Sequence, residues 1–288
     1  MYKCAKDIVK MCDNLKKPIH QIVIMDEIEN TGSNEQRIYE KMDEILRVME
    51  HATQHPIDHN VKTLGGLIGG EGRKMMTYSL SKDTLTGDWM TKAMARAFAC
   101  SEYNASMGKI CAAPTAGSSG IIPAALLTVG EKLGLERKAI LNALITASGV
   151  GKIISKNATV SGAEGGCQAE CGSAAAMAAA GLVEMAGGTP EESFHAAAIA
   201  LKNIMGLICD PIGGLVEAPC SKRNGSGVVN AMVSADMALA GISSIIPFDE
   251  VVEAMYQVGK DMHENYKETA KGGIATTLTG LELGKKTK

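Results

Sequence analysis

Apolar residues recur at helical spacing along most of this 288-residue chain. In residues 35–53 they lie three or four positions apart, which places them on one face of an amphipathic helix. No sustained alternation of apolar and polar residues marks a strand. The pattern predicts an all-α fold, with helices over residues 35–53, 88–107, 118–133, 137–150, 173–186, 189–208, 227–246 and 248–268.

One of these segments is apolar on nearly all sides. Residues 173–186 read SAAAMAAAGLVEMA, so a helix here has no face suited to water and should be buried at the centre. Ser173 is expected to cap its first turn and Gly187 to end it. The next helix begins with TPEES, which puts proline at the first helical position and acidic residues in the first turn.

Glycine interrupts the helical pattern near the N-terminal end. The segment KTLGGLIGGEGRKMMTY (62–78) is interpreted as a loop. Two interpretations stay open: the loop lies near a functional site, or it only connects two parts of the chain. A chain of this length fits one or two domains. We expect a helical N-terminal arm over residues 1–60, packed on a main helical domain over residues 61–288.

Composition excludes several functional classes. The net charge is −3 and aromatic residues make up 3%, which disfavours a nucleic-acid partner. No apolar stretch approaches the ~18 residues that a membrane span needs. The first residues, MYKCAKDIVKMCDNLKK, contain no signal-peptide core. The eight cysteines are therefore expected to be free thiols or metal ligands in a reducing cytoplasm.

Three cysteines lie in short segments marked by glycine or proline. Cys167 is in GAEGGCQAECG, Cys209 in GLICDPIGG and Cys220 in EAPCSKRN. Three thiolates that converge from loops can hold an iron–sulfur cluster and leave one iron open as a Lewis acid. Spacing alone also allows buried, inert thiols, or zinc at a subunit interface. Cys171 follows Cys167 by four positions and is a further ligand or a bystander.

A second candidate site is the segment PTAGSSG (114–120), which leads into a helix. Unpaired N–H groups at a helix N-terminus bind carboxylates, and side-chain hydroxyls add donors. An ordinary serine N-cap is the alternative explanation. The candidate substrate-binding residues of this segment are Thr115, Ser118, Ser119 and Gly120.

A third group precedes the first cysteine of the trio. Asn157 and Ser161 carry polar side chains that could orient a substrate. Lys156 and Glu164 are candidates for a catalytic base. The alternative for Glu164 is a solvent-exposed acidic residue in a loop, without a catalytic role. After the last cysteine, the run Lys222–Asn224 supplies cations that would balance a negative cluster, or forms a solvated turn.

Three histidines recur at spacing four and could share one helix face as metal ligands. They are His51, His55 and His59. Pro56 is expected to interrupt that helix. None of the three lies beside a cysteine motif, so we interpret the run as a surface feature.

These motifs resemble the iron–sulfur type of bacterial L-serine dehydratase, in particular the alpha chain of its two-subunit form. The resemblance covers most of the chain and is weakest over residues 1–60. The segments that carry it are CAAPTAGSSGIIP (111–123), KNATVSGAEGGCQAECG (156–172), CDPIGGLVEAPCSKRN (209–224) and YKETAKGGIA (266–275).

The resemblance implies a helical catalytic domain with cluster and substrate loops at helix ends. It implies a [4Fe–4S] cluster ligated by Cys167, Cys209 and Cys220, with no ligand role for Cys171. The implied reaction converts L-serine to pyruvate and ammonium, with the serine hydroxyl bound at the open iron. An iron–sulfur lyase acting on L-cysteine or L-threonine, a zinc-stabilised subunit without activity, and a redox or oxygen sensor remain alternatives.

This chain departs from the single-chain members of that family in two respects. Those proteins carry a Ser-Ser-His-Thr motif in an additional domain, and no such motif occurs here. The resemblance therefore implies a separate beta subunit that supplies it. Some single-chain members also end in a cysteine that covers the open iron, whereas the tail GGIATTLTGLELGKKTK has none.

Overall fold

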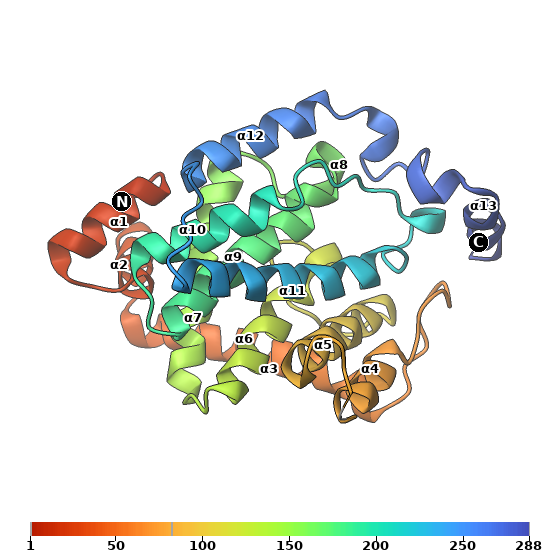
Figure 1. Cartoon of the computed structure of the whole chain (residues 1–288), viewed down its shortest axis with the longest axis horizontal. Helices are drawn as coiled ribbons and strands as arrows, with labels where there is room; N and C mark the ends of the chain where they lie inside the picture. The colour runs from red at the N-terminus through yellow and green to blue at the C-terminus, as the bar shows by residue number, and fades with distance from the viewer. Residues whose placement is uncertain (1, 82, 288) are drawn as a thin grey trace.

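The computed structural model describes residues 2–81 and 83–287 and confirms the all-α fold (Figure 1). No strand occurs in these two ranges, where Cys209 and Lys267 form an isolated parallel bridge. The helices of the described residues are α1 (Ala5–Leu15), α2 (Ile19–Thr31), α3 (Glu35–Asp58), α4 (Glu71–Ser79), α5 (Asp88–Ala105), α6 (Ile121–Lys132), α7 (Arg137–Asn157), α8 (Gly162–Gly165), α9 (Ser173–Met185), α10 (Pro190–Lys202), α11 (Cys220–Leu239), α12 (Phe248–Asp261) and α13 (Leu278–Lys286).

Helix α9 is the buried centre that its composition predicts. Its residues 173–183 are all buried, and α6, α7, α10 and α11 pack around it. Small side chains permit this close approach: a Cβ on Gly181 would lie 2.8 Å from the carbonyl oxygen of Ala143 on α7. Alanine and glycine therefore allow four helices to pack closely around α9. The segments that connect the ends of these helices carry the cysteines described below.

Two predictions near the cysteines are wrong: the N-cap of α9 and the start of α11. Ser173 is not an N-cap, because a π-helical turn, Gln168–Gly172, leads directly into α9. Helix α11 begins at Cys220, well before residue 227, so this cysteine occupies a first helical turn and not a loop. The segment CSKRNG carries no apolar periodicity, and tertiary contacts of its polar side chains support the helix there instead.

Three further boundaries also differ from expectation. Helix α3 continues through Pro56 to Asp58, because the buried proline lies only two residues before the helix ends and disturbs little of the ladder. The segment 62–78, predicted as a loop, contains α4 in its second half. Helix α6 has Gly120 and not serine at its N-cap, after a short 3-10 turn over Ala116–Ser118.

The first three helices pack on the rest of the chain. Helix α2 lies along α7, and α3 contacts α5, α6 and α7. The carboxylate of Asp249 on α12 accepts a hydrogen bond of 2.8 Å from the backbone N–H of Ala5 at the start of α1. These contacts give the packed arrangement expected of residues 1–60, and the division of the chain at residue 60 stays a prediction.

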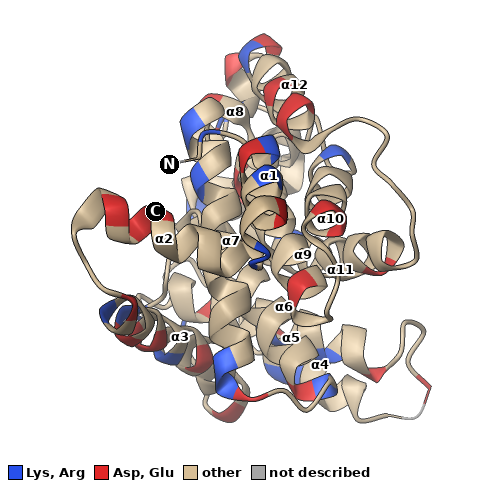
Figure 2. Cartoon of the chain, turned by 90° about the vertical axis from the view of Figure 1, so that its left-hand side faces the viewer, with Lys and Arg blue, Asp and Glu red and all other residues tan. Residues whose placement is uncertain are grey.

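Charged residues of both signs are mixed on the outer helices. Figure 2 shows acidic and basic residues together along the ribbons of α3 and α12. None of the described helices has the length and apolarity to cross a bilayer. The three histidines follow one another along the end of α3: the rings of His51 and His55 stack with centroids 5.0 Å apart, and those of His55 and His59 are tilted with centroids 4.6 Å apart.

Candidate active site

The three predicted cysteines come from three separate elements and meet at one end of the α9 bundle. Cys167 directly precedes the π-helical turn, Cys209 follows α10, and Cys220 begins α11. All three thiols are buried, and burial raises the pKa of Cys209 and of Cys220, the latter to about 12. A thiolate at Cys167 raises both pKa values further, because like charges at short range repel. The three sulfur atoms therefore share one electrostatic environment.

A fourth sulfur atom lies beside the trio. The sulfur atoms of Cys167 and Cys171 are hydrogen-bonded over 3.4 Å, and Cys171 is the donor when Cys167 is a thiolate. This bond is the main reason that the pKa of Cys167 is lowered, and the guanidinium of Arg223 lowers it too, against the effect of burial. Cys167 is thus the thiol of the group that loses its proton most readily.

Arg223 connects the cysteine segments to one another. It lies one turn after Cys220 on α11, and its guanidinium donates to the carbonyl of Ile208 (2.9 Å) and to the carboxylate of Asp210 (2.6 Å). The same carboxylate accepts a bond of 2.8 Å from the backbone N–H of Ile274. A fixed positive charge is therefore held beside the thiols, which favours their ionised form.

The late motif YKETAKGGIA holds the backbone of the second cysteine. The N–H of Cys209 donates to the carbonyl of Tyr266 (2.8 Å), and the N–H of Glu268 donates back to the carbonyl of Cys209 (3.0 Å). Residues 266–268 thus pair with Cys209 as a short strand would. This pairing fixes the position of its thiol relative to the C-terminal segment.

The loop predicted to bind substrate contacts the cysteine region through Glu170. The hydroxyl of Thr115 donates to the Glu170 carboxylate over 2.6 Å. Two glycines give the carboxylate its space: a Cβ on Gly117 would lie 3.1 Å from it, and one on Gly162 only 2.5 Å. Burial raises the pKa of Glu170, against the opposing effect of the Thr115 hydrogen bond. Sequence reasoning missed this residue, although an acid between two cysteines of an apolar segment was a signal.

Asn224 attaches the other side of the same loop to α11. Its side-chain oxygen accepts from the N–H of Gly120 (3.0 Å), and its amide nitrogen donates to the carbonyls of Gly117 (2.7 Å) and Cys220 (2.9 Å). Only glycine fits at position 120, because a Cβ would lie 2.6 Å from the carbonyl oxygen of Ala97. The loop and the start of α11 therefore form one rigid unit.

Comparison with known proteins supports a family assignment for this arrangement. The family model described as "Serine dehydratase alpha chain" matches residues 14–275. The chain belongs to the serine dehydratase alpha chain family. It is 49% identical over 283 residues to the L-serine dehydratase alpha chain of Peptoniphilus asaccharolyticus, covering 98% of this chain and 97% of that one.

Two more relatives show how this family is organised. The chain is 48% identical to the probable L-serine dehydratase alpha chain of Bacillus subtilis, of which it covers 95%. It is 36% identical over 285 residues to the L-serine dehydratase of Helicobacter pylori, but it covers only 62% of that protein. The alpha chain therefore corresponds to about six tenths of a longer relative.

The side-chain hydroxyls of the Thr115 loop form hydrogen bonds with different partners in this alpha chain. Ser118 lies 3.2 Å from the hydroxyl of Thr115 and is buried. Ser119 donates to the carbonyl of Ala116 over 2.9 Å, within the loop itself. The hydroxyl of Thr115 therefore contacts the buried Glu170 directly, and Ser118 is hydrogen-bonded to Thr115.

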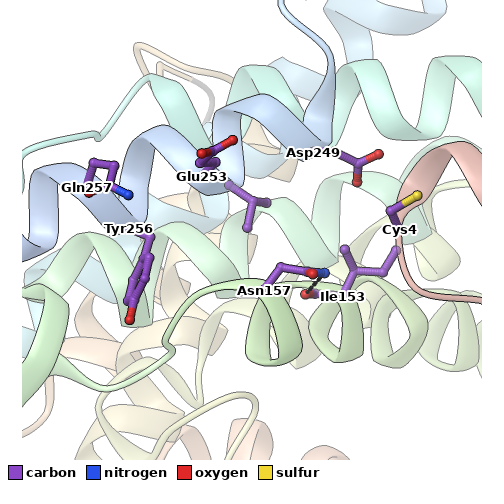
Figure 3. Close-up of a pocket in the computed structure, with 8 residues that line it drawn as sticks. Cys4, Ile153, Asn157, Asp249, Glu253, Tyr256 and Gln257 are labelled. Carbon is purple, nitrogen blue, oxygen red and sulfur yellow. Dashed lines mark hydrogen bonds between the residues drawn. The ribbon is translucent and has the colours of Figure 1, made fainter.

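The structure places the third predicted group differently. The amide of Asn157 donates to the carbonyls of Lys3 and Ile153, both at 2.9 Å. It lines a separate cavity of about 370 Å³ with Cys4, Asp249 and Tyr256 (Figure 3). Its side chain therefore faces the N-terminal segment and α12.

The other members of that group lie at the surface or at a turn. Lys156 is exposed in the last turn of α7, and Ser161 is half-buried where α8 begins. Glu164 is exposed, and its carboxylate accepts a hydrogen bond from the hydroxyl of Thr159. None of these contacts joins the three residues to the thiols.

The donor set has the chemistry of an iron–sulfur site. In residues 2–81 and 83–287, no three His, Cys, Asp or Glu side chains are arranged around one ion position. Iron–sulfur clusters are held by cysteine thiolates. Cys167, Cys209 and Cys220 are buried thiols that interact electrostatically, and the Arg223 guanidinium lies beside Cys167, so their chemistry fits such a cluster.

Proposed function

We propose that this chain is the alpha subunit of an L-serine dehydratase, which converts L-serine into pyruvate and ammonium. The names of the relatives support the reaction. The observation that carries the proposal is the placement of three buried thiols beside the loop that Glu170 and Asn224 hold.

In this proposal Cys167, Cys209 and Cys220 hold a [4Fe–4S] cluster. When bound, the cluster supplies a Lewis-acidic iron at which the serine hydroxyl becomes a leaving group. The guanidinium of Arg223 partly balances the charge of the thiolates from its fixed position against Asp210. Cys171 is a hydrogen-bond donor to Cys167 and not a ligand.

The Thr115 loop is the proposed substrate-recognition element. Its residues Thr115, Ser118, Ser119 and Gly120 precede α6, whose N-terminal dipole favours the carboxylate of an amino acid. Thr115 and Ser118 present hydroxyl groups beside it. Asn157 and Ser161 stay proposed contacts that would require movement of the segment after α7.

The reaction also needs a base. Removal of the α-proton and departure of the hydroxyl leave aminoacrylate, which tautomerises and hydrolyses to pyruvate and ammonium. Lys156 and Glu164 remain candidates, but both are exposed. We add Glu170, because its buried carboxylate contacts the substrate loop and burial raises its pKa, which makes the ionised form a stronger base.

We propose further that a beta subunit completes the enzyme and that the complex works in the cytoplasm. The support is the greater length of the Helicobacter pylori relative, of which this chain covers 62%. The partner would bring the Ser-Ser-His-Thr motif that this sequence lacks. Nucleic acid and membrane are not proposed as partners.

Substrate turnover tests the proposal. The chain is prepared anaerobically with iron and sulfide, mixed with the beta chain of the same organism, and supplied separately with L-serine, L-threonine and L-cysteine. We expect pyruvate from L-serine at the highest kcat/KM, and none from the Cys220→Ser variant. A higher kcat/KM for L-threonine or L-cysteine would assign a different lyase, and no turnover of any of the three would contradict the function.

A further inference from the structure

We infer that the beta chain docks on an apolar patch formed by Leu64, Ile274, Leu278 and Leu281; this inference rests on the proposed function. The exposed fractions of these side chains are 72%, 41%, 77% and 51%. Four neighbouring aliphatic side chains that remain in water are typical of a protein-binding surface. We call them the Leu278 patch.

The segments that carry the patch residues lie close together although they are far apart in sequence. A Cβ on Gly65 would lie 2.5 Å from the side chain of Leu215 and 3.2 Å from that of Thr287, the residue after α13. A Cβ on Gly213 would lie 2.6 Å from the hydroxyl of Thr287 and 3.3 Å from the Cα of Gly284 in α13. Figure 1 shows α13, the loop before α4 and the segment before α11 together at one end of the molecule, opposite the N-terminus.

A hollow in this surface offers an anchoring position. A cavity of about 450 Å³ lies between α13 and the turn at Gly213 and Gly214, and Leu281 and Ala275 are among its lining residues. Binding energy at protein interfaces concentrates where a side chain of one partner fills such a pocket on the other. An apolar side chain of the beta chain would fit here.

Short connections join the patch to the cysteine site. The N–H of Ile274 donates to Asp210, the residue directly after Cys209. The buried carboxylate of Glu217 accepts from the N–H groups of Gly65 (2.6 Å) and Leu67 (2.8 Å), and Glu217 lies three residues before Cys220. A protein bound to the patch therefore lies next to the segments that carry two of the three thiols.

The position of the patch identifies its occupant. A second exposed apolar group, Ile242, Ile245 and Ile246, follows the far end of α11. Helix α11 has 20 residues and separates the two surfaces by about 30 Å. A subunit that contributes to catalysis must reach the cysteines. Of these two surfaces, the Leu278 patch is the one from which a bound subunit can reach them. The part of the longer relatives that this chain lacks is the protein expected there.

A matched pair of charge substitutions tests the surface. Leu278→Asp changes the first residue of α13, where the helix dipole favours an acid, so the fold should persist. The control is Ile245→Asp at the opposite end, where φ is +67° and Asp is tolerated better than Ile. Titration calorimetry with the beta chain should show about tenfold or greater loss of affinity for Leu278→Asp and no loss for the control.

Hydrogen exchange gives a second readout that does not depend on activity. Adding the beta chain should slow exchange in residues 62–70 and 274–286 and leave 242–246 unchanged. Slowed exchange at 242–246 instead, equal affinity of both variants, or no complex with the wild-type chain would overturn the inference. So would a dimer of this chain alone that Leu278→Asp dissociates. A complex on this surface that forms no pyruvate would uphold the inference and refute the proposed function.

Discussion

Thr115 and Glu170 are joined by a hydrogen bond of 2.6 Å although 55 residues separate them in the sequence. The bond crosses from the loop before α6 to the π-helical turn between Cys167 and α9. π-helical turns inside helices occur frequently at functional sites. Here the turn presents the Glu170 carboxylate to the loop, and a Cβ on Gly162 would lie 2.5 Å from that carboxylate and 3.4 Å from the sulfur of Cys209, so the turn lies between the two parts of the proposed site.

Thr115→Val tests the role of this bond. Valine keeps the volume but removes the donor, and the loss of a hydrogen bond to a charged group costs about 1.5–3 kcal/mol. We expect a lower melting temperature and a kcat/KM for L-serine about tenfold lower, equivalent to about 1.4 kcal/mol. Thr31→Val is the control, since Thr31 is exposed at the end of α2. Wild-type kinetics in the Thr115 variant would remove this residue from the site.

The cysteines are distinguished by single substitutions. Cys209→Ser should lose its iron, because a hydroxyl holds iron–sulfur clusters poorly. Cys171→Ala should retain it, since that thiol only donates to Cys167. Cys4→Ser is the control, with a half-buried thiol in the cavity beside α12. Iron and acid-labile sulfide are measured after anaerobic purification.

The contrast between these variants decides the ligand set. Loss of iron from Cys171→Ala, with retention in Cys209→Ser, would show that Cys171 is the ligand and Cys209 the bystander.

Stability should depend on pH through Glu102. This side chain is fully buried, accepts hydrogen bonds from the N–H groups at the start of α4, and has one carboxylate oxygen without a partner. Burial raises its pKa, against the backbone hydrogen bonds. As the pH rises past the unfolded value of about 4.3, the unfolded chain loses this proton first. The free energy of unfolding should therefore fall with rising pH until the folded pKa is reached.

Urea unfolding between pH 4 and pH 8 measures this slope. Glu102→Gln cannot ionise at this position, so its free energy of unfolding should decline less over the same interval. Identical pH slopes for the variant and the wild-type chain would show that the buried carboxyl does not titrate as its surroundings indicate.

The parts of the fold that the sequence predicts have local causes. Helix α9 is apolar on every side, and the TPEES segment begins a helix with Pro190 at its first position, as expected. The structure adds a capping box there, with the Thr189 hydroxyl 3.2 Å from the backbone nitrogen of Glu192. The three cysteines were found because loop residues around them are unusual for inert thiols. The three thiols are buried and interact electrostatically in the structure, and their role as cluster ligands stays a prediction.

The parts that sequence reasoning missed depend on tertiary contacts. The start of α11 is stabilised by Asn224 and Arg223, whose partners lie in distant loops. Helix α4 begins where Glu102 accepts its first N–H groups, which the glycine-rich sequence alone does not reveal. Asn157 is adjacent in sequence to the first cysteine motif, but the extension of α7 turns it toward Lys3.

Metal and sulfide analysis of the anaerobically purified chain decides whether Cys167, Cys209 and Cys220 hold a [4Fe–4S] cluster. We expect about four iron and four acid-labile sulfide per chain. Both should be lost from the variant in which all three cysteines are serine and kept in Cys4→Ser. Zinc in place of iron, with no sulfide, would contradict a cluster and make these three thiols part of a structural metal site.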